Sequence, residues 1–305
     1  MARYIVGRLL GLIFVLIAVS MVTFFLTRSV PGDPFAQGER GLAEATRQAR
    51  YEKYGFDRPL WEQYFLYMGN VVRGDFGTPF QSPTQTVVEL IKETWPVTIR
   101  IGLLTVAISY PLGVTIGVFA ALHRNQAIDY FLTFGVTLGL VLPSFVVAIW
   151  LILLFSVRLD WLPTGGWGRP EHYIMPVLAY SLAPTALVAR YTRTSLLETL
   201  GADHVRTARA KGLREGRVLT WHVARNALIP FVTVMLPEIP NILTGSIFIE
   251  AAFRIPGLGR FFVTSTFTRD YPMILALVLL VAVVWGVTYL LTDILYMLLD
   301  PRIRL

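Results

Sequence analysis

Residues 191–230 read YTRTSLLETLGADHVRTARAKGLREGRVLTWHVARNALIP, a polar and basic stretch between two apolar segments long enough to cross a membrane. The basic residues in or beside it are Arg190, Arg193, Arg206, Arg209, Lys211, Arg214, Arg217 and Arg225, and the acidic ones are Glu198, Asp203 and Glu215. An excess of Arg and Lys in a short loop places that loop on the cytoplasmic side. The stretch is predicted to form two short helices that meet at Gly212, each too brief to be stable alone. We therefore expect a cytoplasmic insert on which a soluble partner presses.

The composition is that of a membrane protein. Apolar residues make up 54% of the 305 positions, charged residues only 15%, and the mean hydropathy is +0.58. A soluble domain carries about a quarter charged residues. The net charge of +7 gathers on loops that flank apolar segments, so it does not indicate a nucleic-acid partner. The chain has no Cys, which excludes disulfides, thiolate metal sites and Cys nucleophiles.

The N-terminus resembles a secretory signal only superficially. Arg3 and Arg8 precede an apolar run over residues 9–26. This run is longer than the apolar core of a signal peptide, and a turn at 31–34 follows it instead of a small-residue cleavage site. We expect an uncleaved first span with its N-terminus in the cytoplasm.

Hydropathy predicts an all-α integral membrane protein with six spans, because a span needs about 20 apolar residues. The spans are expected near residues 9–27, 96–122, 130–157, 173–189, 229–249 and 273–299. An even number of spans returns both termini to the cytoplasm. The chain then divides into residues 1–30 with span 1, an external segment at 31–95, and a core at 96–305 that contains the insert at 191–229.

The external segment is predicted to hold a helix. Apolar side chains from Leu60 to Val71 recur at helical spacing directly after Pro59, and proline suits a helix start. Glycines at 74 and 77 then end the helix. A small helical subdomain is therefore expected over the outer mouth, either as a passive connector or as a docking or gating element.

The insert carries signals for a helix between Asp203 and Lys211. Asp203 suits the start of a helix, either as a cap or through its charge, and Lys211 suits the end. Gly212 sits where a helix stops in the left-handed conformation. Ala208 is expected to permit close approach by a partner surface, and a second helix is expected over residues 214–227. The alternative is a solvated basic loop that only obeys the positive-inside rule.

Residues 206–212, Arg-Thr-Ala-Arg-Ala-Lys-Gly, and 225–230, Arg-Asn-Ala-Leu-Ile-Pro, carry a family resemblance. They resemble the cytoplasmic loop of ABC importer permeases, in the dipeptide, oligopeptide and nickel branch. The general loop pattern of these permeases, Glu-Ala-Ala-x-x-x-Gly followed by Ile-x-Leu-Pro, is retained only at Ala208 and Gly212. Further segments similar to the branch lie at 31–34, 55–60, 74–77, 161–163, 256–260, 269–272 and 300–304.

This resemblance implies a division of labour in a bacterial or archaeal cytoplasmic membrane. Two different permease subunits form the pathway, two cytoplasmic ATPases bind ATP and Mg, and an external binding protein delivers the substrate. The chain itself has no phosphate-binding loop of the Gly-x-x-x-x-Gly-Lys-Ser/Thr type, so no enzyme activity or bound cofactor is expected of it. Di- or oligopeptides are the expected cargo, with nickel chelates, glutathione or another small solute as alternatives.

By the same resemblance, the insert is expected to sit in a groove of the ATPase. A bulky residue at Gly212 or Ala208 is expected to uncouple ATP hydrolysis from transport. The residues expected to couple the two proteins are Asp203, Arg206, Ala208, Lys211, Gly212 and Leu213.

Inside the membrane, Glu238 and Asn241 are the candidate substrate-path residues. They lie in Leu-Pro-Glu-Ile-Pro-Asn at 236–241, where two prolines remove backbone donors from the fifth span. Charges at membrane depth are costly and mark cavities or partners. Glu238 is expected either to meet the ammonium group of a peptide or to pair structurally with a neighbouring helix. Glu250 and Asp293 are expected at the membrane interface.

Two glycine pairs, at 113 and 117 and at 135 and 139, match the small-xxx-small pattern of closely packed membrane helices. An intramembrane enzyme is disfavoured because the chain has no His-Glu-x-x-His, no Gly-x-Ser-x-Gly and no paired membrane-centre aspartates. No metal site is expected either. An ion-coupled carrier remains as a rival, and transport by this chain alone would support it.

Overall fold

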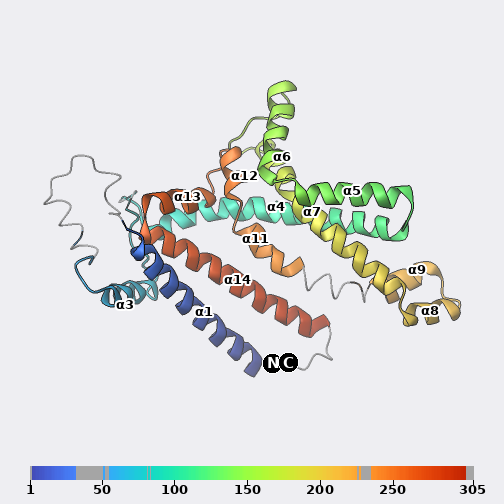
Figure 1. Ribbon diagram of the computed structural model, residues 1–305, viewed down its shortest axis with the longest axis horizontal. Helices are drawn as coiled ribbons and strands as arrows, with labels where there is room; N and C mark the ends of the chain where they lie inside the picture. Colours follow the sequence, from blue (N-terminus) through green and yellow to red (C-terminus); the bar gives the residue numbers. More distant parts are fainter. Residues whose placement is uncertain are drawn as a thin grey trace. The chain divides into compact units, whose positions relative to one another are not determined.

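The computed structural model describes residues 2–31, 51, 55–80, 82, 84–224, 227 and 235–299. The elements in these residues are helices, with no strand among them, which agrees with the predicted all-α class (Figure 1). The chain forms two compact units. One comprises Met1–Val97 with Gly257–Val287, and the other Thr98–Pro256 with Thr288–Leu305.

Four helices are long and apolar enough to cross a membrane: α1 (Ala2–Ser29), α4 (Val87–Leu122), α7 (Glu171–Leu200) and α14 (Tyr271–Leu299). They contain the first, second, fourth and sixth predicted spans. A bent helix pair brings the number of candidate spans to as many as five. The predicted fifth span, residues 229–249, lies partly outside the described residues, so the count of six stays a prediction.

The helix that contains the second predicted span begins before that span. α4 starts at Val87, whereas the span was expected from Pro96. The Thr86 amide donates to a Glu89 carboxylate oxygen at 2.7 Å, and the Glu89 amide donates to the Thr86 hydroxyl at 3.2 Å. This reciprocal pair is a capping box, which satisfies two amides at the helix start.

The third predicted span is not one straight helix. It consists of α5 (Ala127–Val141), α6 (Ser144–Leu151) and the π-helical segment η1 (Ile152–Arg158), bent by 101° at the break. Pro143 causes the break, because a proline disfavours the helical conformation of the residue before it. Leu142 is accordingly extended, with φ −70° and ψ 121°. The structure therefore has a bent helix pair where a third span was predicted.

The described part of the fifth predicted span is broken, as its prolines suggested. It consists of the 3₁₀ turn η3 (Leu236–Glu238), the short helix α11 (Ile239–Leu243) and, after a turn, α12 (Ile247–Ala252). Gly245 in that turn has a φ of +90°, a conformation that L residues rarely adopt. Irregular backbone of this kind is tolerated at membrane depth where it is buried in protein or lines water.

In the first unit, the helix predicted after Pro59 is confirmed. α3 (Leu60–Val71) begins directly after Pro59, and its buried residue Tyr64 packs against Phe24 of α1 and Leu275 of α14. The hydroxyls of Ser20 and Tyr64 are hydrogen-bonded at 2.8 Å. α13 (Gly259–Thr268) was not predicted, and it lies between the fifth and sixth predicted spans.

In the second unit, glycines let α7 approach its neighbours closely. A β-carbon added at Gly113 or Gly117 of α4 would lie 2.7 or 2.6 Å from a carbonyl oxygen of α7. One added at Gly139 of α5 would lie 2.9 Å from Ala186. Gly135 has open space around it, so the packing role expected of the second glycine pair holds only for Gly139.

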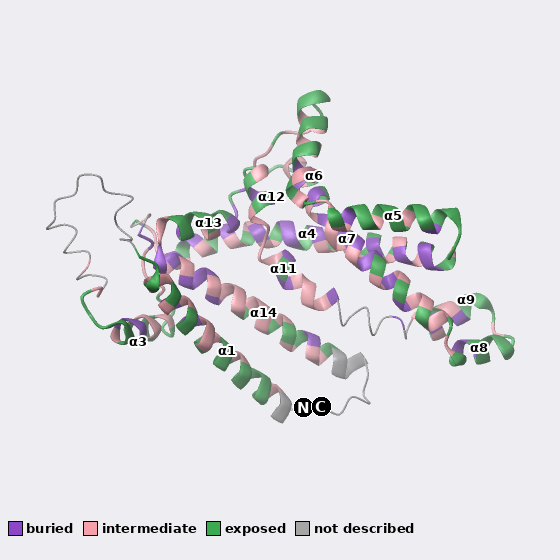
Figure 2. Ribbon diagram, in the orientation of Figure 1, coloured by how far each residue is buried: buried purple, intermediate pink, exposed green. Residues whose placement is uncertain are grey.

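Large apolar side chains remain exposed along α1 and α5, where Figure 2 shows long exposed faces. Phe14 of α1 is 72% exposed and Phe131 of α5 is 75% exposed. A soluble protein rarely leaves such extended apolar faces in water. These faces are suited to lipid.

We predict that Gly117→Ala destabilises the protein whereas Gly135→Ala does not. The added methyl group meets the Ala189 carbonyl oxygen at 2.6 Å in the first case and open space in the second. Overpacking of this kind costs about 1–3 kcal/mol. Thermal unfolding midpoints in detergent measure the difference, and equal midpoints for the two variants would contradict the close packing of α4 on α7.

Candidate functional site

The basic insert folds as three short elements after α7. They are α8 (Asp203–Ala210), α9 (Glu215–Arg217) and the π-helical segment η2 (Val218–Ala224). The first helix is one residue shorter than predicted, and Gly212 has the predicted left-handed conformation with φ +72°. The second predicted helix is instead a single α-turn that continues as π-helix.

Asp203 acts through its charge. The N-cap position is Ala202, and no side chain caps the first turn of α8. Asp203 is the first residue of the helix, where a negative charge favours the helix dipole. Its carboxylate also lies 3.7 Å from Arg206, but both side chains are strongly exposed, so the ion pair adds little.

A small apolar core holds the insert together. Its buried members are Val205, Ala208, Val218 and Val223, and Leu213 packs against them. Leu196 and Leu200, at the end of α7, also pack against this cluster and so attach the insert to that helix. Because tertiary packing is what stabilises helices this short, the cluster explains why α8 forms at all.

This packing shows that the prediction for Ala208, close approach by a partner surface, is wrong. Ala208 is only 4% exposed and faces the apolar core of the insert, not its outer surface. The spacing of Val205 and Ala208, three residues apart on one helix face, explains this direction. Of the six predicted coupling residues, the exposed ones are Asp203, Arg206, Lys211 and Gly212.

An ion pair spans the turn at Gly212. Arg209 contacts Glu215 through two hydrogen bonds, of 2.6 and 3.2 Å. Hydrogen bonding to Arg209 lowers the pKa of Glu215, and the same contact raises the pKa of Arg209. A carboxylate with a lowered pKa stabilises the fold above its ordinary pKa and loses this contribution as the pH falls through the lowered value. The pair is therefore fully ionised at neutral pH.

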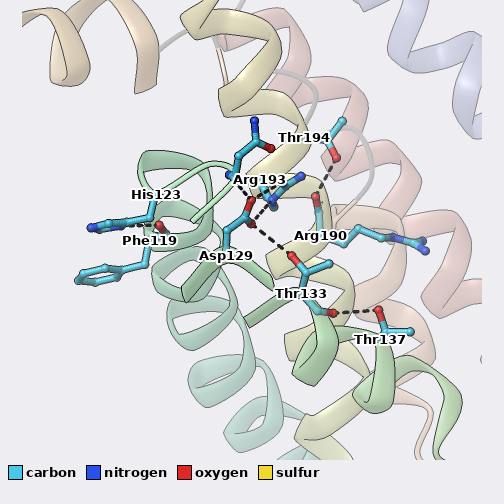
Figure 3. Close-up of polar contacts among 9 residues, drawn as sticks. Phe119, His123, Asp129, Thr133, Thr137, Arg190, Arg193 and Thr194 are labelled. Carbon is cyan, nitrogen blue, oxygen red and sulfur yellow. Dashed lines mark hydrogen bonds and ion pairs between the residues drawn. The ribbon is translucent and has the colours of Figure 1, made fainter. Parts of the chain in front are cut away.

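Another ion pair links α5 to α7, near the start of the insert (Figure 3). Arg193 of α7 donates from Nε and one Nη to the two carboxylate oxygens of Asp129, both at 2.8 Å. The Asn125 amide and the Thr133 hydroxyl donate to the same carboxylate at 3.0 and 3.3 Å. Asp129 is 2% exposed, so its buried carboxylate receives four hydrogen bonds, and Arg193, which donates two of them, neutralises its charge. Planar two-bond contacts of this type fix orientation as well as distance.

Sequence reasoning placed Arg193 in the insert and missed its partner. The two residues lie 64 positions apart, and only the packing of α5 on α7 brings them together. The available signal was a carboxylate in the first turn of an apolar helix, on the same predicted membrane side as the insert. Arg193 therefore fixes α7 in place and adds little free positive charge to the insert.

A cavity of about 240 Å³ lies beside the broken segment in the second unit. Tyr110 of α4, Ser144 of α6 and Tyr180 of α7 line it, together with Glu238 and Asn241. The structure thus brings both candidate substrate-path residues to one wall. Among the described residues, no group of three or more His, Asp or Glu side chains is placed to hold a metal ion.

Glu250, which was predicted to lie at the membrane interface, does not line this cavity and is buried within the protein. It is only 3% exposed and accepts a hydrogen bond of 2.7 Å from the Thr98 hydroxyl. Gly245 also passes close to it, since a β-carbon there would lie 2.8 Å from Glu250 Oε1. The turn before α12 folds this carboxylate inward, and its place at the membrane interface stays a prediction.

Comparison with known proteins assigns the chain to a family. The profile described as "binding-protein-dependent transport system inner membrane component" matches residues 113–305, and the N-terminal profile of the same system matches residues 1–102. The chain belongs to this family of membrane permeases. It is therefore a multi-pass membrane protein, not an enzyme, and ATP hydrolysis in this family is carried by separate ATPase subunits.

Characterised relatives match over the full length. The chain is 40% identical to "Oligopeptide transport system permease protein OppB" of Haemophilus influenzae, with 100% of both chains covered. It is 38% identical to "Dipeptide transport system permease protein DppB" of Bacillus subtilis, covering 100% of this chain and 99% of the relative.

Solved structures support the fold. The permease of the MetNI methionine ABC transporter, in an inward-facing form, aligns with a TM-score of 0.53 at 18% identity. The alignment covers 70% of this chain and 96% of that one. The helical permease architecture therefore extends to this chain.

We predict that Arg193→Ala lowers the stability of the purified protein by about 3 kcal/mol, because it leaves the Asp129 charge buried without its main partner. Arg190→Ala is the matched control, since Arg190 is an exposed arginine on the same helix. Chemical or thermal unfolding in detergent measures both variants. Adding Asp129→Asn to Arg193→Ala is expected to recover part of the loss. Equal stability of the two alanine variants would contradict the role of the ion pair.

Proposed function

We propose that this chain is one of two different permease subunits of an ATP-driven importer of di- or oligopeptides. The full-length similarity to dipeptide and oligopeptide permeases supports this cargo. The observation that carries the mechanism is the insert: an exposed basic face on a short helix whose inner side is packed against the end of α7.

The insert is built to transmit force. Its outer residues Arg206 and Lys211 are exposed, whereas Val205 and Ala208 on the other side of α8 are buried. A push on the outer face therefore acts on the core of the insert and through it on Leu196 and Leu200 of α7. The Asp129–Arg193 ion pair then passes the displacement of α7 to α5.

The remaining parts of the machine lie on partners. Two cytoplasmic ATPases bind ATP and Mg and contact the insert through Asp203, Arg206, Lys211 and Gly212, while Ala208 and Leu213 support that surface from within. An external binding protein delivers the substrate, and alternating access of the two permeases moves it inward. In this arrangement the insert and both termini are cytoplasmic, as the excess of basic residues in the insert requires.

Reconstitution into liposomes tests the proposed function. Uptake of a labelled dipeptide is expected only when this chain, the second permease, both ATPases, the binding protein and ATP are all present. Omitting any one component is the control. Uptake by this chain alone, driven by an ion gradient, would contradict the proposal and favour an ion-coupled carrier.

We predict that the double variant Arg206→Glu and Lys211→Glu uncouples ATP hydrolysis from uptake. Reversed charges on the contact surface cost several kcal/mol of complementarity, so uptake should fall by at least about tenfold. The apolar core of the insert is untouched, so the unfolding midpoint should stay unchanged. Gly212→Trp is a weaker test, because any L residue at φ +72° also strains the turn.

Arg158→Glu is the matched control for charge reversal. Arg158 is an exposed arginine at the end of η1, in the same unit but outside the insert. It should leave both uptake and ATP hydrolysis near the wild-type level. Normal coupled uptake by the double variant would rule out this surface as the ATPase contact.

A further inference from the structure

We infer that the cavity beside the broken segment is a binding site for a primary ammonium group, with Glu238 as its counter-ion. This inference rests on the proposed function and specifies the substrate class of the permease itself. The peptide's free amino terminus supplies such a group.

The two tyrosines that line the cavity, Tyr110 and Tyr180, donate their hydroxyl hydrogens to backbone carbonyls. Ile239 donates its amide to Leu236, forming a 3₁₀ turn, so the Met235 carbonyl loses its usual helical donor. Tyr110 donates its hydroxyl to that carbonyl at 2.6 Å. Pairing orphaned carbonyls in this way keeps the irregular backbone stable in an apolar setting.

Tyr180 serves the next turn in the same manner. Gly245 donates its amide to Ile242 at 3.3 Å, which leaves the Asn241 carbonyl without its helical donor. The Tyr180 hydroxyl donates to this carbonyl at 3.1 Å. Both tyrosine protons are thereby directed to carbonyl oxygens, and neither is directed to the Glu238 carboxylate.

Glu238 has one neutral partner and no protein cation in the part of the chain that the structure describes. Asn241 donates its side-chain amide to Glu238 Oε2 at 3.2 Å. No Lys, Arg or His occurs among the described residues that line the cavity. Pairing with a neighbouring helix, the structural alternative for Glu238, is not seen in these residues, since Asn241 lies three positions away on the same segment.

A carboxylate in a mostly apolar cavity selects a positive ligand. A negative charge at membrane depth is costly unless it pairs with a cation or faces a pathway along which a cation moves. An ammonium group supplies three donors, which suits the unused lone pairs of Glu238. The Asn241 amide holds one carboxylate oxygen and leaves the other for the ligand.

The size of the cavity limits what enters. Sites that enclose a whole drug-sized ligand measure roughly 300–1,000 Å³. At about 240 Å³, this cavity accommodates one end of a peptide and not an extended chain. The site therefore recognises the amino end of the substrate and does not select for the length of the peptide or for the side chains that follow.

The test measures binding of Ala-Ala and of N-acetyl-Ala-Ala to the assembled permease–ATPase complex, purified without the binding protein. Saturation-transfer NMR titration reports weak binding. The wild type should bind Ala-Ala more tightly than the acetylated form, because acetylation removes the charge. Glu238→Gln should weaken Ala-Ala binding by about tenfold or more, as expected for loss of a charge-assisted hydrogen bond, and leave N-acetyl-Ala-Ala unaffected.

Glu93→Gln is the matched control, since Glu93 is an exposed carboxylate on α4 that does not line the cavity, and this variant should bind both probes like the wild type. Equal wild-type affinity for the two probes would overturn the site, and that comparison needs no variant. Unchanged Ala-Ala binding by Glu238→Gln would also overturn it, as would equal loss of both probes.

The experiments distinguish failure of the proposed function from failure of the ammonium site. If the complete reconstituted importer takes up no peptide, the cargo assignment falls, whereas Glu238-dependent binding of Ala-Ala in preference to N-acetyl-Ala-Ala still supports an ammonium site. If the importer takes up peptides but Glu238→Gln binds Ala-Ala normally, the function stands and the ammonium site does not.

Discussion

The constraint on which this structure depends is that backbone polar groups in a bilayer find their hydrogen bonds within the protein. Long helices satisfy it without help, but the segment that contains Pro237 and Pro240 does not. There, Tyr110 and Tyr180 reach from α4 and α7 to the carbonyls that the helix has released. The irregular backbone is thereby fixed in place, and its side chains form the wall of a cavity.

The insert likewise depends on contacts with the rest of the protein. α8 is too short to be stable alone, so four buried side chains and the end of α7 hold it. This leaves its basic outer face exposed and firmly supported. The Asp129–Arg193 ion pair then ties α7 to α5, with both Asp129 oxygens bonded to one guanidinium group. A rigid path thus leads from the exposed face of the insert to the membrane helices.

The sequence predicted the features that depend on local patterns: the apolar helices, the helix after Pro59 and the left-handed Gly212. Two features that were not predicted do have local sequence signals. The start of α4 is marked by the Thr86–Glu89 capping box, and the bend between α5 and α6 is marked by Pro143. The apolar character of the surrounding residues outweighed both signals. The direction of Ala208 and the pairing of Asp129 with Arg193 could not be predicted. Both depend on packing between helices, of α8 on the end of α7 and of α5 on α7. The sequence pattern of one segment does not specify such packing.

Photo-crosslinking from a single thiol tests most directly whether an ATPase drives this chain through the insert. The chain has no native Cys, so Lys211→Cys provides a unique attachment point for a benzophenone probe in the assembled complex. We expect an adduct with the ATPase subunit from Lys211→Cys and none from Trp161→Cys. Trp161 is also exposed, but it lies between the third and fourth predicted spans, in a loop expected outside the cell. A transport-competent complex in which the Lys211 position yields no ATPase adduct would contradict coupling through the insert.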